Sequence, residues 1–413
     1  MRIMTQLRDV VVVDAVRSAI GKSARDGMKK NGQLCQASAQ ELLGATLRGL
    51  VDRVKAQAPS FDERDVEDVI VGCLSQIGEQ GYNVARVGML LAGLPEEVCA
   101  CTVNQFCNAG LKGINFGAQG IQTGNGDVMI CAGVELMSHY GMGSDAEVAL
   151  RAGYPVRMTS RLDEIGMTVP QGMCAEMISE DEGHTREQLD AFGAWSMRKA
   201  VEAQRNGWFD NIVPFEFAWE GETRRVDTDE VFREKAADDP EGFRADLAKL
   251  PTPFKEDGRV TAGNSSQIVD GAAAVMLMAA DKAEALGIEP LCRIASMAVA
   301  GGAPVPMLLA PIPAMHKALD RAGKTIDDMD IIEPNEAFAS PCLAFANAMG
   351  YAYDDPRVNP TGGAIAIGHP IGASGVIYFG EMVRHLKRTG GKYGIQTLCG
   401  GGGLGVATVV EAV

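Results

Sequence analysis

The sequence predicts an α/β protein whose core is a mainly parallel, helix-covered sheet. Three observations carry this prediction: short buried apolar runs alternate with amphipathic helical segments, the two halves of the chain repeat the same order of elements, and a stretch of different composition separates them. With 413 residues the chain is too long for one ordinary core, so two or three subdomains are expected.

The first half begins with a buried strand at 10–13, and an amphipathic helix at 38–55 and a second strand at 66–72 follow it. A helix of small residues at 109–122 then leads into an apolar strand at 127–133. Strands and helices that alternate in this way are typical of parallel pairing, because each parallel connection has to cross over the sheet.

The second half repeats this order with a strand at 293–298, a helix at 314–322 and a strand at 330–333, after a buried strand at 272–279. We interpret the repeat as a weak internal duplication of about half the chain each. Duplicated halves would place corresponding helices face to face across a shared interface.

Two cysteines and a histidine follow the same duplication. Cys107 precedes a helix, a Thr-Gly-Asn-Gly turn and a strand with Cys131, just as His369 precedes a helix, a Thr-Gly-Gly turn and a strand with Cys399. We therefore expect Cys131 and Cys399 to be counterparts, and Cys107 and His369 to meet where the two halves join.

The stretch from about 138 to 258 has more Arg, Asp, Glu and Trp and fewer buried runs. It contains one clear amphipathic helix, 186–206, for which Thr185 and Gln188 form a predicted capping box. Insertions of this kind usually carry substrate contacts, so the stretch is predicted to be a loop-rich subdomain.

The bulk composition excludes several classes of protein. The net charge of −16 argues against nonspecific nucleic-acid binding, because neutralising phosphates requires a basic field. The apolar run at 10–13 is too short for a signal peptide or a membrane span. The ten cysteines do not resemble the framework of a small secreted protein, so we expect a reduced, cytoplasmic protein with no membrane partner.

No metal site is predicted. The chain has no Cys-x-x-Cys pair of the zinc type, and we expect Cys99 and Cys101 to point to opposite faces of one strand.

Cys107 is the first candidate for chemistry, because it stands where an apolar strand gives way to the helix at 109–122. The unpaired N–H groups and the positive dipole end of a helix N-terminus are expected to lower the pKa of such a thiol and to favour the thiolate. A cysteine in this position can also be a small core residue.

Two glycine-rich segments near the other end of the chain supply partners for Cys107. The segment 362–375 contains His369, which can act as a base if its ring reaches the Cys107 sulfur, and the segment 399–405 begins with Cys399. Together they predict acyl transfer on sulfur. The run from Gly400 also fits Gly-x-Gly-x-x-Gly, but the helix, strand and acidic residue of a dinucleotide site are not expected after it.

Other polar residues have plainer interpretations. We expect Cys131 to pack in the core, and Asn335 could cap the helix that follows it. The remaining histidines lie in charged or helical-surface settings and are expected to be solvated: His139, His184, His316 and His385.

In their order and combination, these motifs resemble the thiolase family over essentially the whole chain. The resemblance implies CoA-dependent thiolytic cleavage of a 3-ketoacyl-CoA, as in fatty-acid β-oxidation, or the reverse Claisen condensation of acetyl-CoA, by a ping-pong route through an acyl-cysteine. The segments that carry it are Val-Asn-Gln-Phe-Cys at 103–107, Thr-Ala-Gly-Asn-Ser-Ser at 261–266, Asp-Gly-Ala-Ala-Ala-Val at 270–275, Asn-Glu-Ala-Phe-Ala at 335–339, Gly-His-Pro at 368–370 and Cys-Gly-Gly-Gly at 399–402.

The resemblance also implies roles for single residues. Cys107 resembles the acyl-accepting nucleophile, His369 its base, and Cys399 the thiol that moves a proton at the substrate's α-carbon. Asn335 resembles the residue that holds a water, which forms one oxyanion hole with His369, and the backbone N–H groups of Cys107 and Gly401 resemble the second hole. Residues implied to contact the acyl group or CoA are Ala262, Ser266, Met307 and Phe338, and the candidates for binding the CoA phosphates are Arg157, Arg161 and Arg224.

For the fold, the resemblance implies two mixed, mainly parallel sheets with helices in αβαβα layers and an inserted loop domain. The expected domains are 1–137 with 259–288 for the nucleophile half, 138–258 for the loop domain, and 289–413 for the half with the histidine and second cysteine. Family members are dimers or tetramers that use CoA and acyl-CoA as substrates without a metal or redox cofactor, so a homodimer or homotetramer is expected.

Two departures from the family pattern affect the predicted pocket. Where many members have His-Met-Gly-x-Thr-Ala-Glu, this chain has Pro-Gln-Gly-Met-Cys-Ala-Glu at 170–176, which alters one wall. Asn108 and Ala109 follow the nucleophile, where Gly-Ser or Ser-Ser is commoner. The sequence therefore does not assign the acyl chain length.

Two other functions fit the same fold. A decarboxylating ketosynthase is implied to have two active-site histidines, and the presence of Asn335 and Cys399 argues against it. An acyl-thioester binding or scaffold protein would have lost a catalytic group, and none is missing here.

Overall fold

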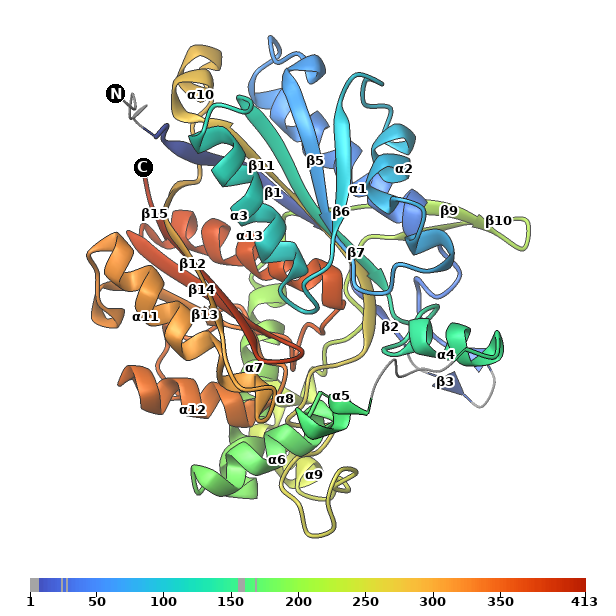
Figure 1. Ribbon diagram of the computed structural model, residues 1–413, viewed down its shortest axis with the longest axis vertical. Coiled ribbons are helices and arrows are strands. Elements are labelled where there is room, and N and C mark those ends of the chain that lie inside the picture. Colours follow the sequence, from blue (N-terminus) through green and yellow to red (C-terminus); the bar gives the residue numbers. More distant parts are fainter. Residues whose placement is uncertain (1–6, 24, 27–28, 155–159, 168) are drawn as a thin grey trace.

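The computed structural model describes residues 7–23, 25–26, 29–154, 160–167 and 169–413 (Figure 1). The strands are β1 (Val10–Ser18), β2 (Gly21–Lys22), β3 (Arg25–Asp26), β4 (Lys29–Lys30), β5 (Val66–Gly72), β6 (Cys99–Val103), β7 (Val128–Leu136), β8 (Ile212–Val213), β9 (Phe215–Trp219), β10 (Glu222–Val226), β11 (Val269–Ala279), β12 (Cys292–Gly301), β13 (Ile331–Pro334), β14 (Tyr393–Gly400) and β15 (Leu404–Glu411). The helices are α1 (Ala39–Gln57), α2 (Val84–Leu91), α3 (Ala109–Gln122), α4 (Ser144–Arg151), α5 (Arg161–Glu164), α6 (Gln171–Asp181), α7 (Arg186–Arg205), α8 (Lys235–Asp238), α9 (Pro240–Leu247), α10 (Ala280–Leu286), α11 (Pro311–Ala322), α12 (Ala339–Met349) and α13 (Ile371–Thr389).

The main sheet runs through both halves of the molecule in the order β13-β14-β15-β12-β1-β11-β7-β5-β6. Its halves meet at β1 and β12, which share only two residue pairs, Val11 with Arg293 and Val12 with Cys292. The two predicted sheets are thus joined at one short seam. Parallel pairing links β5 with its neighbours and β13 with β14, whereas the pairings beside the seam are antiparallel, which confirms a mixed α/β fold.

The predicted duplication is confirmed by the topology. The order β5-β7-β11-β1 in the first half repeats as β13-β14-β15-β12, and each step keeps the same parallel or antiparallel sense. Even the β-bulge recurs, between Val12 and Asp14 in β1 and between Ile294 and Ser296 in β12.

The strand register corrects one predicted equivalence. When the bulges of β1 and β12 are aligned and the residue pairs are followed through β11 and β15, Val128 of β7 corresponds to Tyr393 of β14. Neither strand has a bulge beyond this point, so Cys399 corresponds to Val134 and not to Cys131. The motif comparison was misleading because the two cysteines lie at different depths in their strands: Cys131 is the fourth residue of β7, whereas Cys399 is the seventh residue of β14.

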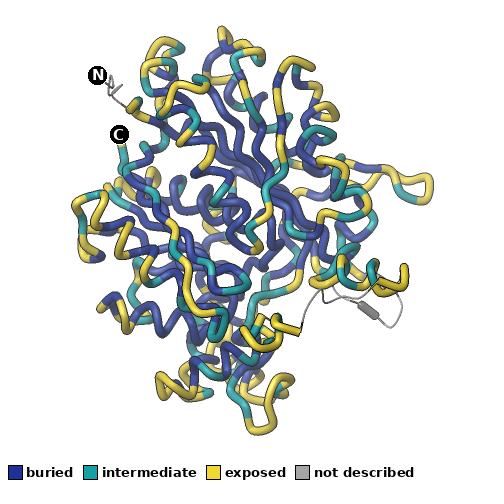
Figure 2. The backbone as a smooth tube through the Cα atoms, in the orientation of Figure 1, coloured by how far each residue is buried: buried dark blue, intermediate teal, exposed yellow. Residues whose placement is uncertain are grey.

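Helices and sheet halves alternate in five layers (Figure 1). Helices α1 and α2 cover the outer face of the first half, α11 and α12 cover that of the second, and α3 and α13 pack together between them. The strands and the central helices are buried, and exposed residues lie mainly in loops and on outer helices (Figure 2). These layers agree with the predicted αβαβα arrangement and place the helices after Cys107 and His369 side by side.

The segment between β7 and β11 contains α4 to α9 and the β9–β10 hairpin. The capping box at the start of α7 is confirmed, because the side chains of Thr185 and Gln188 each bond the other's backbone N–H. Much of this predicted loop domain is helical, and α7 packs against α8, α9 and α12.

Strand β6 forms one edge of the sheet. Cys99 and Cys101 are both exposed on it and Ala100 between them is buried, so the prediction of opposite faces is wrong: alternate residues of a strand point the same way. All ten cysteines are free thiols. Within the described ranges, no helix is long and apolar enough to cross a membrane.

Candidate active site

Cys107 lies on a strained turn between β6 and α3. The preceding residue, Phe106, has a left-handed backbone conformation with φ of 53°, which is unfavourable for a bulky side chain. The turn is held because the Phe106 N–H donates to Asn104 Oδ1 at 2.9 Å and the Asn108 N–H donates to the Gln105 carbonyl at 3.2 Å. These two hydrogen bonds hold the Cys107 thiol at the N-terminus of α3.

His369 is fixed in position and in tautomer. Its backbone N–H donates to the Gln267 carbonyl at 2.9 Å, and its Nδ1 lies 2.7 Å from Ser374 Oγ. The Ser374 hydroxyl donates its single proton to the Pro370 carbonyl at 3.0 Å, so it accepts from an Nδ1–H on the ring. Nε2 is therefore unprotonated, and it is buried with no hydrogen-bond partner among the described residues.

Burial decides the charge state of these groups. It lowers the pKa of His369 to about 4 and raises the pKa of Cys107 above its ordinary value. The predicted thiolate is thus wrong for the ligand-free protein, because loss of solvation outweighs the favourable field of the helix N-terminus. Near neutral pH the pair consists of a neutral thiol and a neutral imidazole.

One cavity of about 230 Å³ brings most of the predicted residues together. Its lining includes the predicted residues Cys107, His369, Ala262, Ser266 and Phe338, and residues that the sequence did not single out as contacts, among them Met137, Gln171, Phe254 and Ile371. The cavity is mainly apolar, as is usual for a site that binds an organic substrate.

Cys399 is not among the residues that line this cavity. It is buried in an apolar cluster with Met307 and Phe338. Burial raises the pKa of Cys399 to about 12, and a charge on Cys399 would raise the pKa of Cys107, so the two sulfurs lie within electrostatic reach. In the amide orientation that satisfies both of its ends, Asn108 donates to the Cys399 carbonyl at 3.1 Å and ties the two segments together.

Asn335 does not cap the following helix. Helix α12 begins after Phe338, and the amide oxygen and nitrogen of Asn335 are both buried without a hydrogen-bond partner in the described part of the chain. The Asn335 amide lies close enough to Cys399 to counteract part of the rise in its pKa. Unpaired buried amides are costly, and they occur where a ligand or water is bound.

The glycine-rich loop after Cys399 packs against the turn that carries Cys107. A Cβ at Gly401 would come within 3.4 Å of the Phe106 ring, and a Cβ at Gly400 would come within 2.9 Å of the Asn108 amide. Glycine thus allows the backbone of this loop to approach the thiol closely.

Some predicted residues do not belong to this group. Arg224 lies exposed on the β9–β10 hairpin, which projects from the molecule, and it does not line the cavity (Figure 1). Arg157 lies outside the described residues. His184, in the turn between α6 and α7, and His385, on α13, are buried and not solvated, whereas His316 is exposed as expected.

Glu135 is an important residue that sequence reasoning missed. Its buried carboxylate accepts the N–H groups of Leu74 at 2.9 Å, Ser75 at 3.1 Å and Gly372 at 3.0 Å, as well as the Gln80 amide at 2.7 Å. Gly372 belongs to the first turn of α13, so Glu135 fastens the His369 segment to the Cys107 half. A charged residue inside the apolar run 128–136 is the signal that could have revealed it.

Gln171 was noticed only as a departure from the family pattern. It lines the cavity at the start of α6, and its amide favours the Cys107 thiolate by contact with the thiol, although burial outweighs this effect.

Comparison with known proteins gives one result over the whole chain. The family models "Thiolase, N-terminal domain" and "Thiolase, C-terminal domain" match residues 10–281 and 288–412. A 3-ketoacyl-CoA thiolase of Marinobacter nauticus is 42% identical over 98% of this chain and 99% of its own length, and one of Marinomonas sp. is 42% identical over 98% of each. One of Alcanivorax borkumensis is 40% identical over 98% of this chain and 99% of its own length. These matches confirm the resemblance seen in the sequence: the chain belongs to the thiolase family.

Proposed function

We propose that this protein catalyses the CoA-dependent thiolytic cleavage of 3-ketoacyl-CoA and the reverse condensation. The observation that carries the proposal is the bare Nε2 of His369 in the cavity that Cys107 lines. A neutral imidazole with a free lone pair is the form that can take a proton from a thiol.

In the first half-reaction, the Cys107 thiol gives its proton to His369 Nε2 and its sulfur attacks the 3-keto carbon. The bond between C2 and C3 breaks, the acyl group stays on Cys107, and the acetyl-CoA enolate takes a proton at C2 from Cys399. In the second half-reaction, the CoA thiol gives its proton to the Cys399 thiolate and its sulfur takes the acyl group from Cys107. The departing Cys107 sulfur regains its proton from His369.

Two oxyanions form along this route, and each needs hydrogen-bond donors. We assign the unpaired amide of Asn335, through a water shared with His369, to one oxyanion, and the backbone N–H groups of Cys107 and Gly401 to the other. A correctly placed donor typically contributes about 10² to 10³ in rate, so Asn335 matters without titrating.

Mass spectrometry of the trapped acyl-enzyme tests the nucleophile. With a 3-ketoacyl-CoA and no free CoA, the acyl group is expected on the peptide that contains Cys107, and Cys107→Ser is expected to abolish the adduct. His369→Ala is expected to slow acylation by about 10³-fold, within the range for a general base. The exposed His316→Gln is the matched control. An adduct on another peptide would overturn the assignment.

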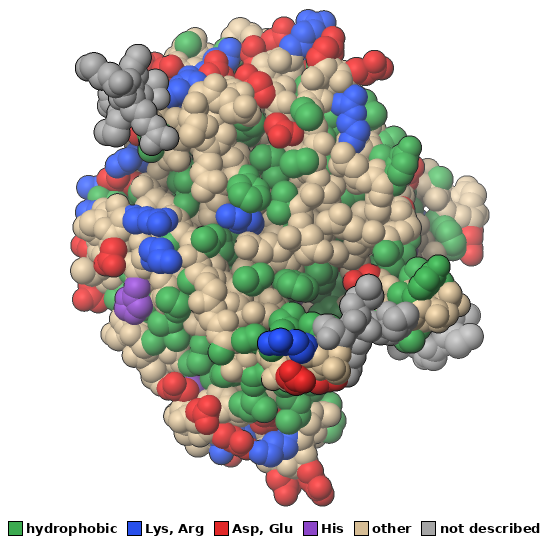
Figure 3. Space-filling view, viewed as in Figure 1, with side chains coloured by type: hydrophobic (Ala, Val, Ile, Leu, Met, Phe, Trp, Pro, Cys, Tyr) green, Lys and Arg blue, Asp and Glu red, His purple; other side chains and the backbone are tan. Residues whose placement is uncertain are grey.

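We also propose a homodimer formed along β6. β6 pairs with β5 on one side, and its other edge has no strand partner among the described residues. The exposed apolar side chains of Leu90 and Leu91 lie on α2, which packs beside β6, and that of Tyr82 lies just before α2. Hydrophobic groups are scattered among uncharged ones over the middle of the face that Figure 3 draws, and most of the charged groups lie towards its rim. An open edge with apolar neighbours favours pairing with a second chain.

Light scattering after size-exclusion chromatography tests the dimer. Leu90→Glu combined with Leu91→Glu is expected to give a monomer, whereas Val299→Glu, on an exposed residue of β12, leaves the mass unchanged. A wild-type monomer at micromolar concentration would contradict the proposal.

All ten cysteines are free thiols, which supports a reducing compartment, and we propose the cytoplasm.

A further inference from the structure

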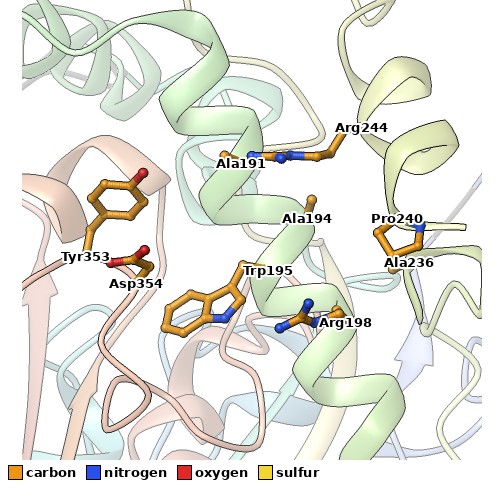
Figure 4. Close-up of a pocket in the computed structure, with 9 residues that line it drawn as sticks. All are labelled: Ala191, Ala194, Trp195, Arg198, Ala236, Pro240, Arg244, Tyr353 and Asp354. Atoms are coloured by element: carbon orange, nitrogen blue, oxygen red, sulfur yellow. The ribbon is translucent and has the colours of Figure 1, made fainter. Parts of the chain in front are cut away.

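A second cavity, of about 390 Å³, lies over α7 and shares no lining residue with the catalytic cavity. Its floor is one face of α7, formed by Ala191, Ala194, Trp195 and Arg198, which follow the spacing of helical neighbours. Helix α9 forms one wall, and the loop at 353–354 forms the other (Figure 4). Two alanines in the floor leave the space open between larger side chains.

Two guanidinium groups enter this cavity from different helices. Arg244 reaches from α9 towards α7, and the Arg198 guanidinium lies beside the Trp195 ring (Figure 4). In the part of the chain that the structure describes, Arg198 has one ion pair, with Glu202 at 3.5 Å on the half-exposed surface, where such a pair contributes little. Among the described residues, Arg244 has no side-chain ion pair or hydrogen bond. In a chain with a net charge of −16, this cavity carries two guanidinium groups, and the one carboxylate in its wall, that of Asp354, balances them only in part.

Trp195 provides a fixed flat surface beside these charges. The Lys199 ammonium lies 3.2 Å from the centre of the indole ring and donates to the Val358 carbonyl at 2.7 Å, so it holds one side of the ring. The Phe192 ring packs against it at 6.0 Å and 62°. An aromatic ring that is held in place and lines a cavity can stack with a planar ligand at little entropic cost.

We propose that this cavity binds a nucleotide of the size of a nucleoside monophosphate. The base stacks on Trp195, the phosphate binds Arg198 and Arg244, and a ribose hydroxyl or base amino group donates to the Asp354 carboxylate in the wall. Guanidinium groups suit phosphate because they offer paired donors in one plane. The volume lies within the range of small-molecule sites. This site is distinct from the acyl-transfer chemistry, and binding there needs neither Cys107 nor His369.

Isothermal titration calorimetry of the full chain with AMP tests the proposal. Saturable binding is expected, and adenosine and inorganic phosphate should each bind at least about tenfold more weakly, because each offers only part of the contacts. Arg244→Gln and Trp195→Leu are each expected to weaken AMP binding about tenfold or more, while Trp195→Phe retains most of it. Arg64→Gln, at an exposed arginine elsewhere, is the matched control and leaves binding unchanged.

Binding is also expected to survive alkylation of Cys107, since the catalytic cavity is separate. No saturation with millimolar AMP would overturn the proposal. So would wild-type affinity in Arg244→Gln combined with displacement of AMP by CoA, because AMP would then occupy the substrate site. If Trp195→Leu fails to fold by circular dichroism, the exposed Arg244 variant still decides the question. Loss of acyl transfer has no bearing on this readout.

Discussion

The ends of β7 and β14 occupy equivalent places in the two halves of the molecule, yet they carry different chemistry. Near the end of β14, the buried Cys399 thiol lies beside the unpaired amide of Asn335. Near the end of β7, the Glu135 carboxylate is fully used by four donors. The duplication therefore gives two strand ends with the same backbone position and different uses. The end of β7 holds the two halves together through Glu135, and the end of β14 leaves the Cys399 thiol available for proton transfer.

The largest expected effect comes from a substitution at the end of β14, which tests whether this strand end has a chemical role that the end of β7 lacks. Cys399→Ala is expected to slow carbon–carbon bond cleavage by about 10³-fold or more, because the enolate loses its proton donor. Transfer of an acyl group from a simple acyl-CoA to Cys107 should continue. Loss of 3-ketoacyl-CoA absorbance measures the first reaction, and mass spectrometry of the acyl-enzyme measures the second.

Cys131→Ala is the matched control, since it removes a buried thiol from β7. It should leave both reactions intact. If Cys399→Ala affected cleavage and acyl transfer equally, the separate role of Cys399 would be wrong.

Glu135→Gln tests whether the other strand end fastens the halves. The amide keeps the size of the side chain but cannot accept all four donors, so the free energy of unfolding should fall by about 2–3 kcal/mol and turnover by about 10-fold to 100-fold. The carboxylate also raises the pKa of Cys107, so the pH profile of Cys107 alkylation should move to lower pH in the variant.

Glu67→Gln provides the control for charge alone. Glu67 accepts the Val128 N–H at 3.0 Å at the opposite end of β7, and its substitution should leave the alkylation profile unmoved. A profile that is also unmoved in Glu135→Gln would mean that Glu135 acts on stability only.

Ser374→Ala tests how the start of α13 positions His369, the partner of the Cys107 thiol at the start of α3. Without the hydroxyl, Nδ1 loses its acceptor and the ring of His369 is no longer held in the tautomer that leaves Nε2 bare. We expect kcat to fall about tenfold with little change in the KM for CoA, and Ser374→Thr to restore most of the rate. Full activity of the alanine variant would show that the ring is held by other contacts.

The smallest expected effect is the acid sensitivity of the second half. Burial lowers the pKa values of both His369 and His385 to about 4, from about 6.5 in the unfolded chain. The unfolded chain binds more protons between these values, so the stability that neutral histidines allow is fully present above pH of about 6.5 and is lost as the pH falls towards 4. Denaturant titrations across this range should show it, and His385→Phe should move the loss to lower pH. An unchanged pH dependence would exclude His385 as a contributor.

The sequence located most elements because each has a strong local signal. The predicted strand at 66–72 and helix at 109–122 agree with β5 and α3 residue by residue. The capping box of α7 was readable because it depends on two residues three positions apart. The convergence of Cys107 and His369 on one cavity was also predictable, since duplicated halves place their corresponding helices together.

Long-range contacts account for the errors. The histidines at 184 and 385 have polar neighbours in the sequence, but packing between helices buries them. Arg224 has the right charge for a phosphate contact, yet the hairpin that carries it projects away from the cavity. The equivalence of Cys131 and Cys399 failed because the register of strands follows their hydrogen bonds and not the spacing of motifs.

By itself, the sequence determined the mixed α/β class, the duplication and the meeting of Cys107 and His369 in one cavity, because periodicity and glycine-rich motifs are local properties of the chain. Only the tertiary structure decided the protonation states of those groups and the tie between the halves through Glu135. Both depend on what surrounds a side chain: burial removes solvent from Cys107 and His369, and a carboxylate on one strand reaches donors more than 200 residues away along the chain.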